Sequence, residues 1–230
     1  VNANILYAGT DDGLIQVSEN GGESWRKIES IKGIPELTYV NMLWASQHDE
    51  NVVYAVFNNH KRGDFKPYIM KSSDKGLTWE AIQNNLPERG SVYSIAEDHV
   101  DKNLLFAGTE FACFVSVDGG QNWVKFSAGL PTICVRDMAI QKRENDLVLG
   151  TFGRGFYILD DYSALRNLKK EDLEKDASIF PIKDALAYVE SNPLGLTGVS
   201  MQGASMYSAP NPAFGATFTY YVKNSPKSPK

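Results

Sequence analysis

Four acidic side chains are the candidates for acid–base catalysis in this sequence: Asp11, Asp12, Glu110 and Asp137. Enzymatic hydrolysis of a glycosidic bond uses two carboxyl groups, about 5–5.5 Å apart in retaining enzymes and about 6.5–9.5 Å apart in inverting ones. Asp11 or Asp12 together with Glu110 or Asp137 can supply such a pair. The alternative is that Asp11, Asp12 and Gly13 only form a hairpin turn. Both interpretations stay open at the level of the sequence.

Four further side chains have the chemistry to hold a ligand: Arg62, Tyr93, Arg136 and Arg154. A guanidinium group donates paired hydrogen bonds to a carboxylate, and a tyrosine offers an aromatic face together with a hydroxyl. An ion pair between Arg154 and Asp160 or Asp161 is the alternative for that arginine. The three histidines lack the spacing of metal ligands, so we expect no metal site and no cofactor.

A repeated eight-residue frame determines which elements must position these side chains. It occurs at 18–25, 72–79 and 116–123. Its shared positions are Ser18, Asn20, Gly22 and Trp25, then Ser72, Asp74, Gly76 and Trp79, then Ser116, Asp118, Gly120 and Trp123. A frame that recurs once per structural unit indicates a repeat architecture. It is therefore expected to be scaffold rather than a place of chemistry.

The residue types of the frame are those of a tight hairpin turn. The Asp or Asn oxygen is expected to accept hydrogen bonds from backbone N–H groups two residues on, with the Ser hydroxyl as a further partner. The Gly positions fit a positive φ, which costs a residue without Cβ little. Each Trp is then expected to begin a return strand and to be buried between neighbouring sheets.

Short apolar runs rich in β-branched and aromatic residues recur in phase with the frame and predict strands. The run at 4–10 matches 103–109, and both resemble 51–55 and 145–151. Four antiparallel strands in each unit of about 40–50 residues are typical of a β-propeller blade. We predict an incomplete first blade at about 4–29 and blades at about 38–84, 91–128 and 134–189.

The frame resembles the Asp-box of BNR-repeat proteins, which include sialidases, other glycoside hydrolases and sortilin-type receptors. The phrases at 108–111, 115–120 and 153–161 are similar to large bacterial secreted proteins of the sortilin-like propeller type, often labelled glycosyl hydrolases. The resemblance covers residues 1 to about 190, and Asn20 replaces the usual Asp. It implies an extracellular or periplasmic location and Asp-boxes that lie away from any active site. A sialidase would also need an arginine cluster, and its motif is not found at the expected place.

The fold class expected is therefore all-β, a partial propeller of four-stranded antiparallel blades with Asp-box hairpins, cut from a larger ring. The missing blades of a longer chain are expected as its partners. A net charge of −5 with interspersed signs argues against nucleic acid, and no run is long and apolar enough for a membrane span. Cys113 and Cys134 are expected as free thiols.

The C-terminal third breaks the repeat. Residues 161–175 have helical spacing and are expected to pack as a short helix on the last blade. Residues 178–190 are expected as an edge strand that completes the fourth blade. An extended loop is predicted at 191–213, then a strand and linker at 214–230 toward a following domain.

Propeller ligand sites gather on one face, where the loops opposite the repeated frame lie. The leading expectation is a scaffold that binds a protein, peptide or carbohydrate on this loop face. A glycoside hydrolase with a carboxylate pair is the enzymatic alternative, and a purely structural spacer is the third possibility.

Overall fold

The computed structural model describes residues 2–127, 129–185, 187–189 and 214–224. The chain divides into two compact units, residues 1–166 and residues 167–230. Each unit is described by itself below.

Unit 1 consists of four antiparallel sheets, named A to D in chain order. Sheet A contains β1 (Leu6–Gly9), β2 (Ile15–Ser18) and β3 (Arg26–Ile28). Sheet B contains β4 (Tyr39–Ala45), β5 (Val53–Asn59), β6 (Asp64–Ser72) and β7 (Glu80–Ala81), with the 3-10 turn η1 (His60–Arg62) between β5 and β6. Sheet C contains β8 (Val92–Glu97), β9 (Leu105–Thr109), β10 (Cys113–Ser116) and β11 (Val124–Phe126). Sheet D contains β12 (Val135–Gln141), β13 (Asp146–Thr151) and β14 (Phe156–Leu159), and the 3-10 turn η2 (Tyr162–Asn167) follows.

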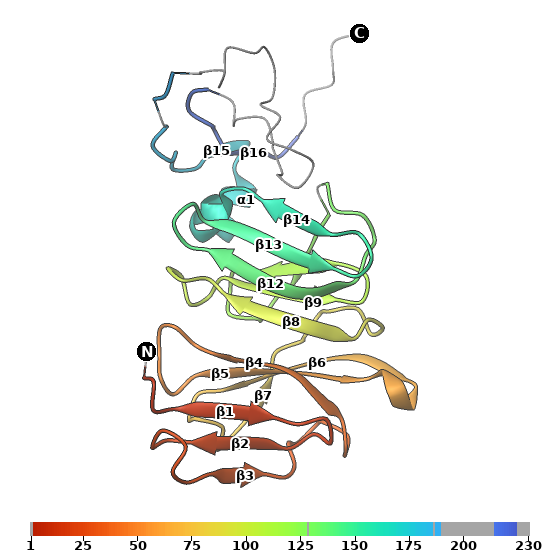
Figure 1. Ribbon diagram of the computed structural model, residues 1–230. Helices are drawn as coiled ribbons and strands as arrows, with labels where there is room; N and C mark the ends of the chain where they lie inside the picture. The colour runs from red at the N-terminus through yellow and green to blue at the C-terminus, as the bar shows by residue number, and fades with distance from the viewer. Residues whose placement is uncertain (1, 128, 186, 190–213, 225–230) are drawn as a thin grey trace, which may run out of the picture. The chain divides into compact units, whose positions relative to one another are not determined.

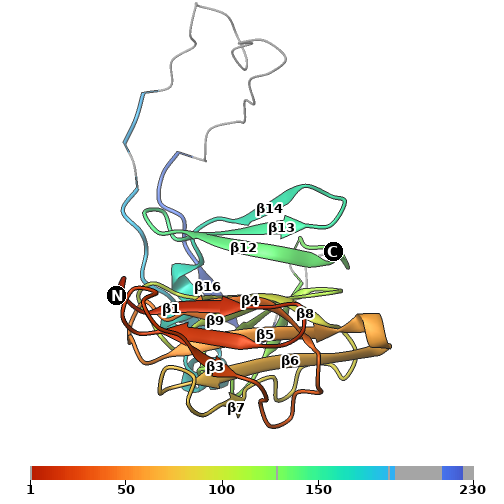
Figure 2. The same ribbon diagram turned by 60° about the horizontal axis from the view of Figure 1, so that its bottom comes forward.

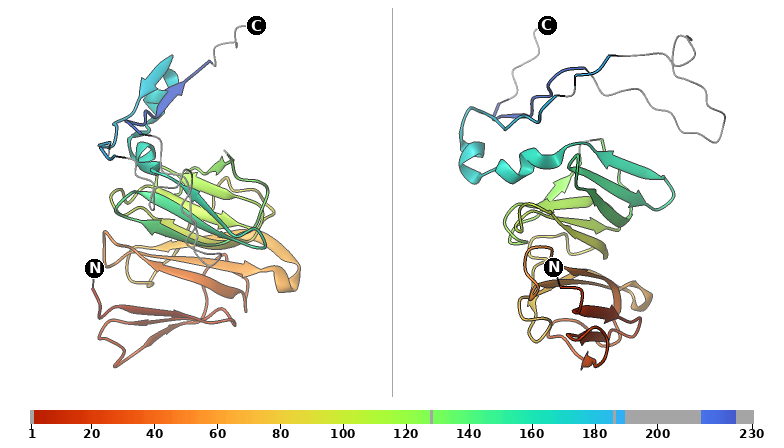
Figure 3. Two further views of the ribbon diagram at one scale, coloured as in Figure 1. Left: turned by 45° about the horizontal axis from the view of Figure 1, so that its top comes forward. Right: turned by 60° about the vertical axis from the view of Figure 1, so that its left-hand side comes forward.

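The four sheets of unit 1 follow one another in space in the order of the chain (Figures 1 and 3). Three apolar clusters fill the spaces between A and B, B and C, and C and D. Strand β5 shows how one strand serves two clusters, because Tyr54 and Val56 pack toward sheet C while Ala55 and Phe57 pack toward sheet A. Successive side chains of a strand point to opposite faces of its sheet. Sheets B and C each lie between two clusters, so both of their faces are buried.

Sequential antiparallel strands in stacked sheets confirm the expected fold class: unit 1 is part of a β-propeller. Its first and last sheets have three strands each, and its two central sheets have four. Strands β4, β8 and β12 begin sheets B, C and D and are called the inner strands here. The β5–β6 hairpin with η1 projects beyond the neighbouring loops (Figure 2).

The repeated frames form the β2–β3, β6–β7 and β10–β11 turns. In the second frame, the Ser72 hydroxyl accepts from the Gly76 N–H at 2.7 Å and donates to Asp74 at 2.7 Å. Asp74 accepts the Thr78 N–H at 2.8 Å. The bonds to Asp or Asn thus come from the N–H four residues on, not two as expected, because the turn includes a second residue with positive φ, Lys75 in this frame. All three frame glycines have φ between 80° and 98°.

The second and third repeated turns dock on the sheet before them and the first has no such sheet, which explains the different burial of the three Trp side chains. The Trp123 indole donates to the Ile82 carbonyl of sheet B at 2.7 Å and is 3% exposed. Trp79 packs against sheet A. No described sheet lies on the corresponding side of sheet A, and Trp25 is 44% exposed. The expectation that all three rings are buried is therefore wrong for Trp25.

A buried carboxylate attaches η2 to sheets C and D. The Arg166 guanidinium donates to both oxygens of Asp98, at 2.8 and 2.7 Å, and the Tyr162 hydroxyl donates to Asp98 at 2.7 Å. Burial alone would raise the pKa of Asp98, but these bonds outweigh it and hold the pKa at about 2. The first part of the predicted helix is thus a 3-10 turn that the Asp98 carboxylate holds in place. Tyr162 and Leu165 of this turn belong to the apolar cluster between sheets C and D.

Unit 2 contains helix α1 (Lys170–Glu174), β15 (Ala177–Ile179) and β16 (Tyr220–Val222). Strand β15 pairs with β16 and not with β14, so the expected outer strand at 178–190 does not complete sheet D. The strand is also shorter than expected, because Pro181 has no N–H to continue the ladder. Within the described part of 214–230, residues 214–224, the predicted strand is observed at Tyr220–Val222. The loop expected at 191–213 lies outside the described residues.

Candidate functional site

Each inner strand of unit 1 carries a β-bulge near its start, on the face opposite the repeated turns. The pairing with the second strand skips Asn41 in sheet B, Tyr93 in sheet C and Arg136 in sheet D. A bulge leaves its extra residue out of the ladder and re-aims the side chain, and bulges are frequent beside functional sites. We call Asn41, Tyr93 and Arg136 the bulge row, and the face that carries it the loop face.

Hydrogen bonds connect the first half of the bulge row across two sheets. The Asn41 amide donates to the Tyr93 carbonyl and accepts the Asn58 amide at 3.0 Å. The side chain of Asn58 in turn contacts the imidazole of His60. Phe57, Thr109 and Thr151 pair with the Val that precedes each bulge, so the residue next along the chain is Asn58 in sheet B, Glu110 in sheet C and Phe152 in sheet D.

The second half of the bulge row is a stack of a cation on aromatic rings. The Arg136 guanidinium carbon lies 4.1 Å from the centroid of the Tyr93 ring and 5.4 Å from that of Phe152. Tyr93 is only 4% exposed, whereas Arg136 is exposed and Phe152 is 70% exposed. Burial raises the pKa of the Tyr93 hydroxyl while the Arg136 charge lowers it, and the net direction is upward. Arg136 is thus an exposed cation on a fixed aromatic base.

Glu110 lies close to this stack. Its backbone N–H donates to the Ser91 carbonyl at 2.9 Å, and its Oε2 is buried without a hydrogen-bond partner. Its charge acts on Tyr93 and on Cys134. Burial raises the pKa of the Cys134 thiol and the Arg136 charge lowers it, and the net direction is upward. The structure therefore brings Glu110, Tyr93 and Arg136 together, and adds Cys134 to them.

Asp11 and Asp12 lie in the β1–β2 turn of sheet A, two sheets away from Glu110. The Thr10 hydroxyl donates to Asp12, and the Gly13 N–H donates to the Thr10 carbonyl at 3.3 Å. The hydrogen bond from Thr10 lowers the pKa of Asp12. A lowered pKa favours a carboxylate over a proton donor. This geometry matches the hairpin-turn alternative for both residues.

The three remaining candidates, Asp137, Arg62 and Arg154, differ in the contacts they make. Asp137 is exposed and accepts the Met138 N–H at 2.8 Å, beside the bulge at Arg136. The Arg62 guanidinium donates to the Glu36 carbonyl at 3.1 Å, which is a structural contact. Arg154 is exposed, and none of the ion pairs found among the described residues includes it.

The alternative ion pair of Arg154 with Asp160 or Asp161 does not form, because Arg154 precedes β14 and the two acids follow it at the other end of the strand. The segment at 58–67 continues β5 and β6 around η1, and Gly63 closes η1 with φ 74°.

The bulges and Cys134 are the parts of the site that sequence reasoning missed. A signal was present: a buried Val directly precedes each bulged residue, at positions 40, 92 and 135. The strict alternation of a strand breaks at that point in all three sheets. Pairing register decides whether such a break becomes a bulge, and register is a property of two strands together.

Two other kinds of site are absent from the described ranges. No three His, Cys, Asp or Glu side chains there are grouped as metal ligands. None of the helices in those ranges is long and apolar enough to cross a bilayer.

The fold is similar to that of solved propeller structures. YCF48 bound to D1 peptide superposes with a TM-score of 0.53 at 14% identity, over 70% of this chain and 49% of that chain. The GH74 xyloglucanase from Xanthomonas campestris gives 0.51 at 18% identity, over 67% and 25%. The extracellular domain of BT4673 from B. thetaiotaomicron gives 0.53 at 15% identity, over 71% and 20%.

At these identities the likeness shows the fold alone. The chain matches about half or less of the length of each of these three structures. A scan against protein-family models and a search of curated proteins gave no match.

Proposed function

We propose that unit 1 is a binding scaffold whose loop face holds a protein, peptide or glycan partner through the bulge row. The observation that carries this proposal is the Arg136 guanidinium, exposed over the rings of Tyr93 and Phe152. Arginine and aromatic residues are the types enriched in the energetically dominant parts of binding interfaces.

The stack makes Arg136 a suitable anchor for a partner. Contact with two rings limits the conformations of its long side chain, so less entropy is lost when a partner binds. The rings occupy the face of the guanidinium and leave its N–H edges for an acceptor such as a carboxylate or a carbonyl. Tyr93 is fixed in turn by the Asn41 amide, which donates to its carbonyl.

The repeated turns support a wider proposal about origin and setting. Their Ser, Asp or Asn, Gly and Trp contacts agree with the resemblance to BNR/Asp-box repeats of the sortilin-like type. We propose that the chain contributes blades to a larger ring, and that it acts in an extracellular or periplasmic location. The neighbour described as an extracellular domain and the one described as peptide-bound are compatible with this setting.

The experiment is a parallel screen of the protein on a glycan array and on a peptide array. Wild type is compared with Arg136→Lys, Arg136→Met and Phe152→Ala. Arg143→Met is the matched control, since Arg143 is an exposed cation in the β12–β13 turn on the opposite face. A ligand signal that falls roughly tenfold in Arg136→Met, as loss of an interface hot spot predicts, and is unchanged in Arg143→Met supports the proposal.

One observation favours a second function. Glu110 has a buried carboxylate oxygen without a partner, and Asp137 lies on the neighbouring inner strand. A glycoside hydrolase that uses these two acids predicts turnover of an aryl glycoside that Glu110→Gln abolishes. Such turnover would replace the binding proposal, whereas its absence together with array binding supports the scaffold.

A further inference from the structure

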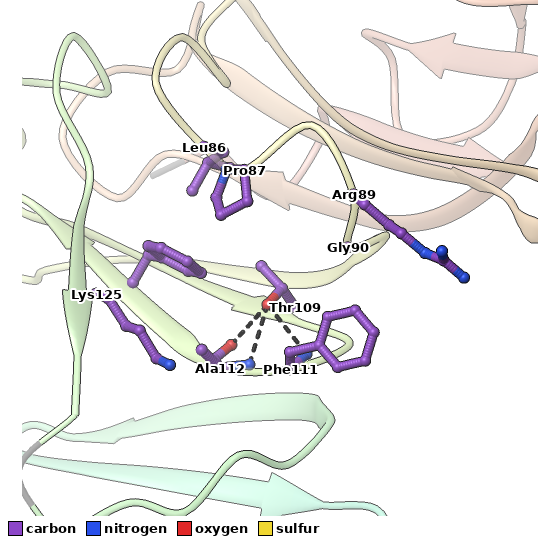
Figure 4. Close-up of a pocket in the computed structure, with 9 residues that line it drawn as sticks. Leu86, Pro87, Arg89, Gly90, Thr109, Phe111, Ala112 and Lys125 are labelled. Carbon is purple, nitrogen blue, oxygen red and sulfur yellow. Dashed lines mark hydrogen bonds between the residues drawn. The ribbon is translucent and has the colours of Figure 1, made fainter.

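A shallow apolar pocket lies between sheets B and C, and none of the residues that line it belongs to the bulge row. It has a volume of about 140 Å³ and lies between the β7–β8 connection and the β9–β10 turn. Figure 4 shows Leu86 and Pro87 on one side of it and Phe111 and Ala112 on the other. Arg89 and Lys125 also line the pocket.

We infer that this pocket is a second binding site, which takes one aliphatic side chain of an extended peptide with acidic residues on either side. The inference does not rest on the function proposed for Arg136. It assigns a separate function to a separate group of residues in the same unit.

The size of the pocket selects the occupant. An apolar cavity of about 150 Å³ holds a group the size of benzene, whereas sites for small molecules usually measure about 300–1,000 Å³. The pocket of about 140 Å³ therefore suits one branched aliphatic side chain. Its apolar lining would leave the hydroxyl groups of a sugar without partners, which disfavours a glycan.

The walls of the pocket are fixed by hydrogen bonds before any partner arrives. The Gly90 N–H donates to the Phe65 carbonyl at 2.8 Å, which attaches the β7–β8 connection to β6. The Thr109 hydroxyl donates to the Ala112 carbonyl at 3.0 Å and accepts the Ala112 N–H at 3.1 Å, as Figure 4 shows. A preformed pocket costs little ordering entropy when it binds.

Charge selects the residues that flank the anchor. Arg89 and Lys125 are the only charged residues that line the pocket, and both are exposed. The Arg89 guanidinium is held 5.1 Å from the centroid of the Phe65 ring. Two cations beside an apolar pocket are complementary to carboxylates on both sides of an apolar residue.

The test uses fluorescein-labelled synthetic nonapeptides and fluorescence anisotropy at 50 and 300 mM NaCl. The probe has a central Leu between Glu-rich flanks. Three comparison peptides differ from the probe in one feature each: a central Ala, a central Gln, or Lys-rich flanks. Tighter binding of the Leu probe than of the Ala peptide by about fivefold or more is expected from the buried methyl groups. Binding that weakens at 300 mM NaCl is expected from the charges.

Two pocket variants locate the binding. Phe111→Ala removes one wall, and Arg89→Glu with Lys125→Glu reverses the charge; these exposed positions allow folding, which thermal melts check. The matched controls are Phe156→Ala, another exposed ring at the start of β14, and Lys102→Glu, an exposed cation on the opposite face. Both pocket variants are expected to weaken binding about tenfold and both controls to leave it unchanged.

The inference is overturned if the central residue makes no difference, if Lys-rich flanks bind more tightly, or if the pocket variants bind like wild type. Arg136→Met separates this site from the proposed one. If the Leu probe still binds that variant fully, the pocket acts alone, even when the array screen for the bulge row is negative. If Arg136→Met abolishes probe binding while Phe111→Ala does not, the pocket is not the site.

Discussion

Replacing Arg166 by Met is expected to destabilise unit 1 strongly, although Arg166 does not belong to a candidate site. Its guanidinium donates to both oxygens of Asp98, whose side chain is completely buried. The Tyr162 hydroxyl and two backbone N–H groups also donate to that carboxylate. Met keeps much of the apolar stem of Arg166 and removes only its charge and its donors.

The size of the effect follows from burial. Removing one partner of a buried ion pair costs about 3–5 kcal/mol, because the remaining charge is left uncompensated. A domain of this size loses about 2–4 °C in Tm per kcal/mol, so a fall of roughly 10 °C is expected. Arg143→Met is the matched control, since the Arg143 side chain is 82% exposed, and its effect is expected to stay within about 0.5 kcal/mol.

The pH dependence gives a second, independent measurement. The pKa of Asp98 is lowered from 3.8 to about 2, which corresponds to roughly 2–3 kcal/mol of stability. Because the folded pKa lies below the unfolded one, this stability is present above pH 4 and is lost as the pH falls toward 2. The difference in Tm between wild type and Arg166→Met should therefore shrink between pH 4 and pH 2.

Thermal melts followed by circular dichroism at several pH values provide the assay. A Tm loss below about 2 °C in Arg166→Met, or one equal to that of Arg143→Met, would refute the reasoning. So would a difference between wild type and variant that does not change between pH 7 and pH 2.

Three further predictions concern packing. Gly108→Ala should cost about 1–3 kcal/mol in chemical denaturation, since its Cβ would lie 2.8 Å from a backbone oxygen of sheet D; the phase-equivalent Gly150→Ala, with nothing nearer than 3.5 Å, should cost clearly less. Trp123→Ala should cost about 3–5 kcal/mol, while Trp25→Ala, which removes a ring that is 44% exposed, should cost less than half as much; equal losses would contradict the docking of the Trp123 turn on sheet B. Cys113, whose thiol pKa burial raises to about 12, should resist labelling by a disulfide reagent until the protein is unfolded, and rapid labelling in the native state would disprove its burial.

The repeated frame owes its turn geometry to local chemistry and the burial of its Trp side chains to the tertiary structure. Its residue types predict tight turns with glycine at positive φ, and the three turns have this geometry. Turn chemistry is local, because side chain and backbone partners lie within four residues of one another. The burial of Trp25, Trp79 and Trp123 is not local, since each ring depends on the sheet that lies next to it.

The candidate site shows the same division. Arg136 and Tyr93 were recognisable as ligand-binding types, and the phase of the repeat assigned them to equivalent strands. Their stacking depends on two bulges in different sheets, which no pattern within one strand specifies. The surroundings of the acidic candidates differ for the same reason. Asp12 is bonded within its own turn, whereas Glu110 in sheet C lies near Arg136 of sheet D.

The sequence by itself determined the all-β class, the places of the turns and the face that carries the loops. These follow from period-two alternation and from turn residues, which act over a few positions. Only the tertiary structure decided that β15 pairs with β16, that Asp98 holds η2, and that Asn41, Tyr93 and Arg136 form one row. Those arrangements depend on register and packing between segments far apart in the chain, where the free energy belongs to pairs of elements.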